Sequence, residues 1–295
     1  MELCKLFGVS LRIHPTLLVV LAFYGVLGFA AQALLIFSLV LGHELAHLLT
    51  ARVYGFKVVG LELFPFGGAA YCDDLFEGRK IEESMMALAG PAFNIALLFA
   101  AQILRWQGIW TSELADNFVR YNLWLAAFNL LPVLPLDGGR ALRALCVEGF
   151  GFVRTTKFLA WAGKGLGVIS ALYGVLLWSK GQFAEGSLTF IVLGGFFWLS
   201  GNKEISVAHI TFLRQLTRKK EELIKKGLMR SKWLTVQRNT PLVRIVEEFT
   251  PDRYTLVTLP KEDKGLEKIL TETDVLEGML REGIRFPVGK LLTKE

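Results

Sequence analysis

Two histidines and a glutamate interrupt an apolar run near the start of the chain, in the stretch Leu41-Gly42-His43-Glu44-Leu45-Ala46-His47-Leu48-Leu49. In an α-helix, His43 and His47 lie four residues apart and point from the same face. This spacing lets two imidazole nitrogens bind one Zn²⁺, with Glu44 beside them as a base for water. A charged group at membrane depth costs roughly 2.5–3.5 kcal/mol. The sequence therefore predicts a metal site with hydrolytic chemistry inside a membrane-spanning helix.

The composition is that of a membrane protein with a soluble tail. Hydrophobic residues make up 53% of the chain, charged residues 20%, and the mean hydropathy is +0.43. Charged residues become dense from Lys203 onward. We therefore expect a transmembrane domain over residues 1–202, a basic linker helix over 203–229 and a small cytosolic domain over 230–295. The net charge of +6 is explained by basic cytosolic loops, and no interleaving of basic and aromatic residues points to nucleic acid.

The predicted fold is a polytopic α-helical membrane protein with about six transmembrane helices. A bilayer crossing needs about 20 mostly apolar residues. Six segments meet this requirement: 13–31, 34–54, 84–104, 119–136, 158–178 and 184–201. Segment 58–72 is apolar but short, and Pro65, Gly67 and Gly68 interrupt it. We expect it to form a re-entrant hairpin or loop, which is tolerated at membrane depth only where protein or a water-filled cavity satisfies its backbone.

The loop charges predict the orientation, since basic loops stay in the cytosol. A cytosolic N-terminus places these basic residues inside: Lys5, Arg12, Arg52, Lys57, Arg79, Lys80, Arg140, Arg143, Arg154 and Lys157. It leaves these outside: Arg105, Arg120 and Lys180. Both termini are then cytosolic. His43 and His47 then fall in the inner half of the second span, and Asp137 lies at the inner end of the fourth, so the two clusters have a similar depth.

A catalytic zinc usually has three protein ligands and an open fourth position. The candidates for the third ligand are His14, Glu62, Asp137 and His209. We favour Asp137 because it combines a carboxylate with the depth of the two histidines. Asp-Gly is also a common turn dipeptide, so the pattern at Asp137 taken alone is ambiguous. The His₂Asp set with an open position favours zinc over other metals.

The motifs in their order along the chain resemble the site-2 protease family of intramembrane zinc metalloproteases. They are His43-Glu44-Leu45-Ala46-His47, Phe66-Gly67-Gly68, Gly90-Pro91-Ala92-Phe93-Asn94 and Asn129 through Asp137-Gly138-Gly139. The resemblance covers about the first two-thirds of the chain. It is strongest to the branch of endospore formers that has six spans and a cytosolic tail domain.

The resemblance implies roles for individual residues. His43, His47 and Asp137 would be the zinc ligands and Glu44 the general base. Asn129 would be a polar group at the reacting carbonyl or the substrate backbone, or alternatively an amide that packs between helices. A packing role is also what we expect of Asn94 in the third span.

The resemblance also implies a substrate and a place. The substrate would be a membrane-associated sigma factor precursor, cut near the cytosolic face of the mother-cell-derived membrane around the forespore. Inhibitory membrane proteins would be partners alongside the lipid bilayer.

The order of elements after residue 230 resembles one cystathionine-beta-synthase-type (CBS) repeat. Expected strands near 234–236 and 254–259 flank a helix at 241–249, and the stretch 269–276 leads into another helix. By this resemblance, Thr271 and Asp274 would contact the ribose of ATP or another adenine nucleotide. The same Thr-x-x-Asp pattern equally predicts a helix cap. Such repeats work in pairs, so a single repeat predicts pairing with a second chain in a homo-oligomer.

Two other functions remain open at the level of sequence. A metal transporter would also place histidines and an aspartate in its spans, although it has no need for Glu44 or for the Gly67-Gly68 loop. A catalytically silent membrane scaffold would carry the same spans. Zinc flux in vesicles tests the first alternative, and the Glu44→Gln variant tests the second.

Overall fold

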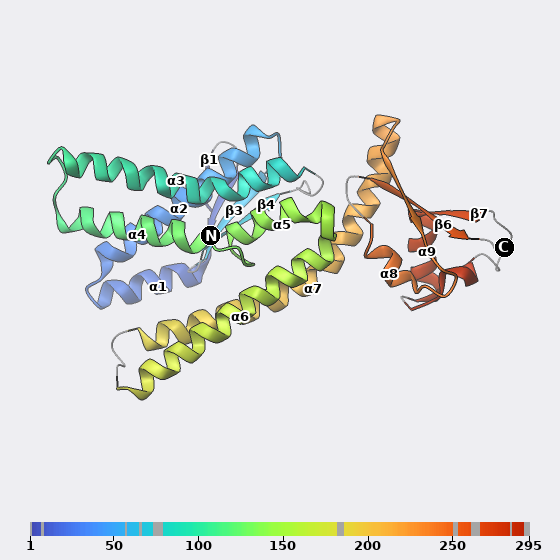
Figure 1. Ribbon diagram of the computed structural model, residues 1–295. Helices are drawn as coiled ribbons and strands as arrows, with labels where there is room; N and C mark the ends of the chain where they lie inside the picture. The colour runs from blue at the N-terminus through green and yellow to red at the C-terminus, as the bar shows by residue number, and fades with distance from the viewer. Residues whose placement is uncertain are drawn as a thin grey trace. The chain divides into compact units, whose positions relative to one another are not determined.

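The computed structural model describes residues 2–6, 9–56, 58–64, 67–72, 79–181, 186–249, 253–260, 266–283 and 285–291. Contacts divide the chain into two compact units, Met1–Ala144 and Leu145–Glu295. Both units are mainly helical, and each has its own small β-sheet (Figure 1).

Three helices in the described ranges are long and apolar enough to cross a bilayer: α2 (Ala30–Val53), α3 (Lys80–Trp106) and α6 (Phe152–Ser179). The helices α1 (Pro15–Val26) and α4 (Glu113–Asn129) have 12 and 17 residues, fewer than the roughly 20 that a crossing needs. Helix α7 (Ser187–Lys226) continues for 40 residues from the expected sixth span into the expected basic linker. The number of six spans therefore stays a prediction.

A four-stranded sheet belongs to the first unit. Its spatial order is β1 (Glu2–Leu6), β2 (Val9–Ile13), β3 (Val58–Phe64) and β4 (Gly67–Cys72). The expected re-entrant segment forms the antiparallel hairpin β3–β4, and its Pro65 and Phe66 lie outside the described residues. The sequence analysis did not predict β1 and β2. Strand β2 pairs in parallel with β3 across the whole of α1 and α2, a contact that no local pattern reveals.

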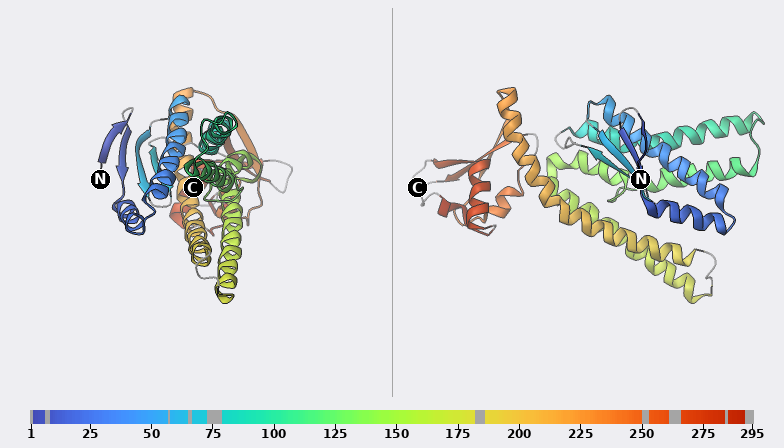
Figure 2. Two further views of the ribbon diagram at one scale, coloured as in Figure 1. Left: turned by 90° about the vertical axis from the view of Figure 1, so that its left-hand side faces the viewer. Right: turned by 180° about the vertical axis from the view of Figure 1, so that it is seen from behind.

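The sheet and α2 pack together, as the views of Figures 1 and 2 agree. Helix α2 ends in a Schellman motif, in which Gly55 has a positive φ of 80°. The N–H of Gly55 donates to the carbonyl of Arg52, and the N–H of Phe56 donates to that of Ala51. Phe56 is thereby buried against Leu48 and Leu61, and the chain turns directly into β3.

The expected fourth span, 119–136, is shorter in the structure, because α4 ends at Asn129. Pro132 and Pro135 follow, and proline disfavours helical backbone at its own position and the one before it. The segment between α4 and α5 (Asp137–Phe150) is therefore irregular. Asp137 follows this segment as the first residue of α5.

In the second unit, α6 and α7 pack along each other as a helical hairpin, and a three-stranded sheet follows (Figure 1). The sheet has the order β5 (Ser231–Thr235), β6 (Tyr254–Pro260), β7 (Leu266–Thr271), with β5 parallel and β7 antiparallel to β6. The helices α8 (Leu242–Val246) and α9 (Glu272–Glu282) accompany it, and a short 3₁₀ turn η1 (Val288–Leu291) follows α9. The expected strand, helix, strand and final helix are present, and β7 completes the sheet.

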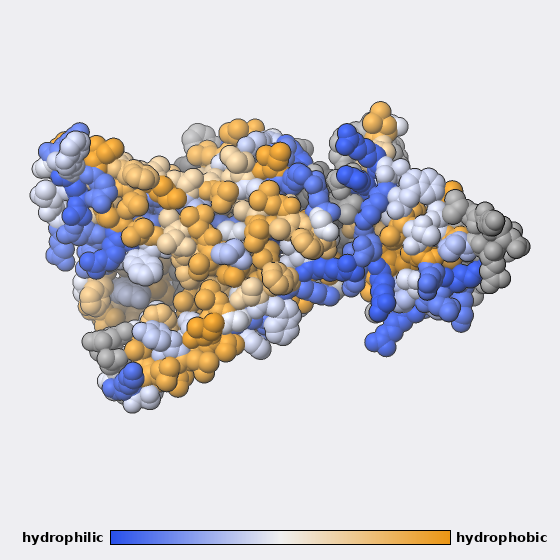
Figure 3. Space-filling model, in the orientation of Figure 1, coloured by the Kyte–Doolittle hydropathy of each residue, from blue (hydrophilic) through white to orange (hydrophobic). Residues whose placement is uncertain are grey.

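Large apolar side chains cover much of the outer surface of the membrane-type helices. Figure 3 shows hydrophobic residues over the face of these helices that is turned to the viewer. Exposed examples are Phe23, Phe99, Trp124, Phe158 and Trp161. Such a surface suits a lipid environment, since a soluble protein rarely exposes extended apolar patches.

Candidate metal centre

The imidazoles of His43 and His47 meet the carboxylate of Asp137 inside the first unit. Both histidines lie on α2, and Asp137 is the first residue of α5. Asp137 Oδ2 is 3.0 Å from His43 Nε2 and 3.2 Å from His47 Nε2. The two Nε2 atoms are 3.1 Å apart. Ligand atoms about 2.0–2.1 Å from a tetrahedral zinc are about 3.3–3.4 Å from one another, so the spacing fits one zinc ion.

The hydrogen bonds of the other ring nitrogens also fit a metal. His43 Nδ1 lies 2.5 Å from the amide oxygen of Asn94, and His47 Nδ1 lies 2.7 Å from the carbonyl oxygen of Met86. Both oxygens can only accept, so each Nδ1 carries the proton and donates. In a neutral ring, Nε2 is then a bare acceptor, directed at the same point as the carboxylate of Asp137. Three acceptor atoms that converge in this way form a group that could hold a metal ion.

Gly90 of α3 provides the space next to this point. A Cβ at residue 90 would lie 2.4 Å from His47 Nε2 and 2.5 Å from His43 Nε2. Real Cβ atoms do not approach other atoms so closely, so any side chain here would occupy the position that a bound ion needs.

The irregular segment before α5 holds Asp137 in place. Cβ atoms at Gly138 and Gly139 would lie 2.3 Å from backbone atoms of Leu130 and Val133, respectively. Only glycine permits this close approach. The pair of glycines thus lets the first turn of α5 pack on the preceding segment, with Asp137 buried at its beginning.

Glu44 lies beside the two histidines and contacts the sheet. Its Oε1 accepts a hydrogen bond of 2.9 Å from the backbone N–H of Gly68 in β4. A Cβ at residue 68 would lie 2.7 Å from Glu44 Cδ, so this contact also requires glycine. An ionised carboxylate has about four lone-pair sites, and one backbone bond leaves others to accept a proton.

The other predicted site residues form hydrogen bonds with partners outside the group of three ligands. The Asn129 amide donates to Leu125 O in its own helix, over 3.1 Å. Thr271 and Asp274 are in the second unit and form a reciprocal capping box at the start of α9, which is the helix cap that the sequence also allowed.

The other candidates for the third ligand have different positions. The side chain of His14 caps α1, and Glu62 pairs in β3 with Arg12 and Ala69. The side chain of His209 is outside the described part of the structure. Among the described residues, only His43, His47 and Asp137 form a group that could hold a metal ion.

Sequence reasoning missed the residues that support the histidines. We expected Asn94 to be a packing amide, but it is fully buried and bonds to His43. Met86, Gly90 and Asn94 follow one another at intervals of four residues on α3, which places them on one helix face. This interval was the available signal for a helix face turned toward the two histidines.

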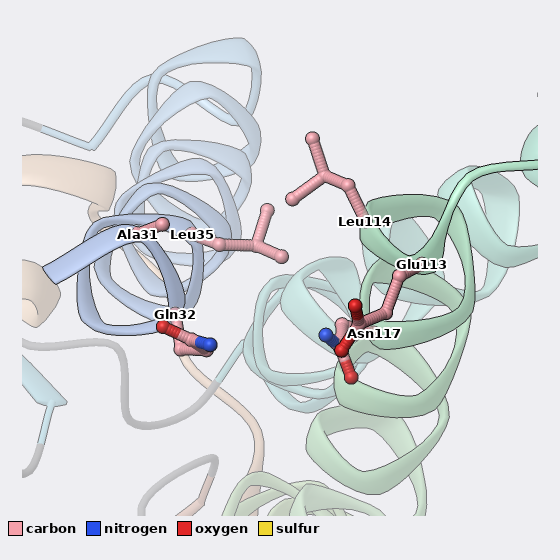
Figure 4. Close-up of a pocket in the computed structure, with 6 residues that line it drawn as sticks. All are labelled: Ala31, Gln32, Leu35, Glu113, Leu114 and Asn117. Atoms are coloured by element: carbon pink, nitrogen blue, oxygen red, sulfur yellow. The ribbon is translucent and has the colours of Figure 1, made fainter. Parts of the chain in front are cut away.

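A shallow pocket of about 180 Å³ lies elsewhere in the first unit, between the first turns of α2 and α4. Figure 4 shows the side chains of Gln32 and Asn117 extending toward each other across it. Leu35, Glu113 and Leu114 contribute to its walls. It contains none of the predicted metal ligands.

Comparison with known proteins identifies relatives. Residues 31–115 match the model of Peptidase family M50. A zinc metalloprotease of Methanocaldococcus jannaschii is 34% identical over 186 residues, which are 59% of this chain and 54% of that protein. Stage IV sporulation protein FB of Bacillus subtilis is 32% identical over 148 residues, which are 50% of this chain and 51% of that protein. The chain thus spans about half the length of the curated relatives it matches.

A solved structure is similar as well. The site-2 protease from Methanocaldococcus jannaschii has 28% sequence identity and a TM-score of 0.56, covering 70% of this chain and 94% of that chain. The histidines and Glu44 of α2 fall within the segment that matches the family model. Over these matched segments, the chain is therefore similar to proteins of peptidase family M50 and to a site-2 protease of known structure.

Proposed function

We propose that the chain is an integral-membrane zinc metalloendopeptidase, with His43, His47 and Asp137 as zinc ligands and Glu44 as general base. The observation that carries the proposal is the convergence of the two Nε2 atoms and Asp137 Oδ2 within 3.2 Å of one another, beside the carboxylate of Glu44, which accepts from the backbone N–H of Gly68. The similarity to peptidase family M50 over residues 31–115 and to a zinc metalloprotease of Methanocaldococcus jannaschii supports the same interpretation. A metal transporter has no use for Glu44 at this position.

The residues divide the chemistry of peptide hydrolysis among them. A zinc ion on the three ligands would polarise the scissile carbonyl and acidify the attacking water. Glu44 accepts a proton from the water and later delivers it to the leaving amine. Gly68 N–H orients the Glu44 carboxylate for this task. Asn129, one amide proton of which is used by Leu125, has a second proton for the carbonyl oxygen or the substrate backbone.

Substrate binds in extended form, since a helix hides its own peptide bonds. Strand β4 lies at the edge of the described sheet and can add a substrate strand through its backbone groups. Because Gly68 belongs to β4 and contacts Glu44, a segment on this edge would run close to the base. Replacement of Gly67 and Gly68 by valine should abolish cleavage and leave zinc bound; cleavage at the wild-type rate would contradict this part of the proposal.

The finer assignment concerns substrate and place. Similarity to stage IV sporulation protein FB supports a sigma factor precursor as substrate, cut near the cytosolic face during sporulation in the membrane around the forespore. Six spans with both termini in the cytosol, and inhibitory membrane proteins as partners, belong to the same proposal.

The tail domain over residues 230–295 is proposed as a CBS-like regulatory module. The order β5, α8, β6, β7, α9 supports it. An adenine nucleotide at Thr271 and Asp274 would have to share these side chains with the capping box of α9. Pairing of two such modules would make the protein a homo-oligomer. Equilibrium binding of ATP to the full chain, compared with the Thr271→Ala variant, tests the nucleotide.

The first experiment compares wild type with Glu44→Gln, each co-expressed with a sigma factor precursor that carries a membrane-associated pro-segment. We expect cleavage only by wild type and equal zinc content in both proteins. Equal cleavage by both would remove Glu44 from the mechanism. Zinc transport into vesicles by wild type and variant alike would favour the transporter.

A further inference from the structure

We propose that Asn122 and Asn94 are positioning residues, which act in series to hold His43 with its Nε2 toward the metal. The inference rests on the proposed zinc site and assigns two residues that the proposed mechanism does not use. They come from α4 and α3, so three helices contribute to the orientation of one ligand (Figure 1).

The hydrogen bonds form one directed chain from a backbone carbonyl to the ligand. Asn122 Nδ2 donates to Phe118 O over 2.9 Å, and Asn94 Nδ2 donates to Asn122 Oδ1 over 3.0 Å. His43 Nδ1 then donates to Asn94 Oδ1 over 2.5 Å. A carbonyl oxygen only accepts, so Phe118 sets the direction of every later bond. The chain ends by placing the proton of His43 on Nδ1, away from the metal.

The hydrogen bonds of this series are buried. Asn94 and Asn122 are both 0% exposed, and His43 is 5% exposed, so bulk water cannot replace a missing partner. A half-turn of the Asn94 amide would bring its NH₂ against the N–H of His43 and its oxygen against Asn122 Oδ1. Both contacts would then be mismatched at a buried site, where unsatisfied polar groups are strongly unfavourable. Asn122 therefore fixes the orientation of the Asn94 amide, and through it that of His43, without contacting His43.

The two histidines differ in this respect. His47 Nδ1 bonds to a backbone carbonyl, that of Met86, and substitution of a side chain cannot remove that acceptor. His43 depends on a side chain, which depends in turn on a second side chain. We therefore expect zinc affinity to respond to a substitution at Asn122 in α4, which does not contact the ligands.

The test measures zinc affinity of the full-length protein in detergent by competition with a chelator. The variants are Asn94→Leu, Asn94→Asp, Asn122→Leu and the double leucine variant. Aspartate at residue 94 still accepts from His43, whereas leucine fills similar space without an acceptor. Asn117→Leu is the matched control, because Asn117 is also an asparagine of α4 but is only partly buried and lines the pocket of Figure 4. Thermal unfolding of each metal-free protein reports on packing separately.

We expect Asn94→Leu to weaken zinc binding by about 10- to 100-fold, the usual effect of losing a partner of a metal-bound histidine. Asn122→Leu should weaken zinc binding less than Asn94→Leu does. The double variant should bind zinc no more weakly than Asn94→Leu alone. Asn94→Asp and Asn117→Leu should have the smallest effects on zinc affinity. The absence of additivity is the signature of residues that act in series.

Three results would overturn the inference. Zinc affinity could be the same in Asn94→Leu as in wild type, with only the metal-free protein destabilised, which would assign the amides to packing. Asn94→Asp could lose as much affinity as Asn94→Leu. A wild-type protein that binds no zinc would overturn the proposed function, and this inference with it.

Discussion

At the scale of single residues, the space beside the metal centre depends on Gly90. Its missing side chain leaves room within 2.5 Å of the Nε2 atoms of both histidines. We predict that Gly90→Ala abolishes stoichiometric zinc binding and cleavage, because the new methyl group would take the place of the ion. Metal analysis of the purified protein checks this.

The control for Gly90→Ala is Gly165→Ala on α6, where a new Cβ meets nothing within 4 Å. Alanine is favoured over glycine in a helix by about 1 kcal/mol, so the control should bind zinc normally and unfold at the same or a higher temperature. A Gly90→Ala protein with a full equivalent of zinc would show that the ion binds elsewhere.

The ligand residues could be inferred from sequence because their chemistry follows from short spacing. His43 and His47 are one helical turn apart, and residue type with expected depth singled out Asp137, which the structure brings to the same point. The roles of Asn94 and Asn122 could not be inferred, since their partners come from other helices and only the packing of α2, α3 and α4 brings them together. An asparagine in an apolar helix gives no indication of its partner.

At the scale of elements, α5 is anchored to α3 near the start of both helices. Arg143 Nη2 lies 3.1 Å from Glu83 Oε1, and both side chains are largely buried. Ser84 Oγ donates to Ala141 O over 3.3 Å. Since α5 begins with Asp137 and α3 carries Gly90, these contacts fix the ligand helix to the helix that shapes the site.

We predict that Glu83→Ala lowers the free energy of unfolding of the first unit by about 3 kcal/mol, because it removes one partner from a buried ion pair. Thermal unfolding in detergent measures the loss. The matched control is Glu82→Ala, whose ion pair with Arg79 is more exposed, with side chains 28% and 46% accessible. An exposed pair contributes about 0–1 kcal/mol, so equal effects of the two substitutions would contradict the prediction.

Local pattern predicted the elements to different extents. The apolar runs indicated the helices α2, α3 and α6, and the alternating stretches after residue 230 indicated β5, β6 and α9. Pro132 and Pro135 indicated that the helix breaks beside Asn129, where α4 ends, whereas hydropathy alone extended the expected span to residue 136. Strands β1 and β2 were missed because their pairing is non-local: β2 lies beside β3, which follows two helices later.

At the scale of the whole molecule, the C-terminal sheet shares its hydrophobic core with the helices before it. Val147, Phe152 and Val153 pack in one buried cluster with residues of α8, β6, β7 and α9. Arg154 forms ion pairs with Glu247 and Glu248 in the same unit. Composition separated a membrane part from a charged tail, but it could not reveal that apolar residues before α6 and in its first turn complete the core of that tail.

This shared core leads to a prediction for the full chain. Phe152 is 2% exposed in the cluster, whereas Phe158, six residues later on α6, is 73% exposed. Phe152→Ala should destabilise the sheet β5–β7 by about 3–5 kcal/mol, the usual cost of removing a buried aromatic ring. Hydrogen exchange of the amides in these strands, measured on the intact protein, should accelerate accordingly.

Phe158→Ala is the matched control, since it removes the same ring from the same helix at an exposed position. Exchange in β5–β7 should then stay at the wild-type rate. Equal protection of the strands in wild type and Phe152→Ala would mean that the C-terminal domain is stable without α6. Faster exchange in Phe152→Ala alone would show that the first turn of a membrane-type helix is part of the folding unit of the C-terminal domain, so that any ligand that stabilises the sheet also stabilises the start of α6.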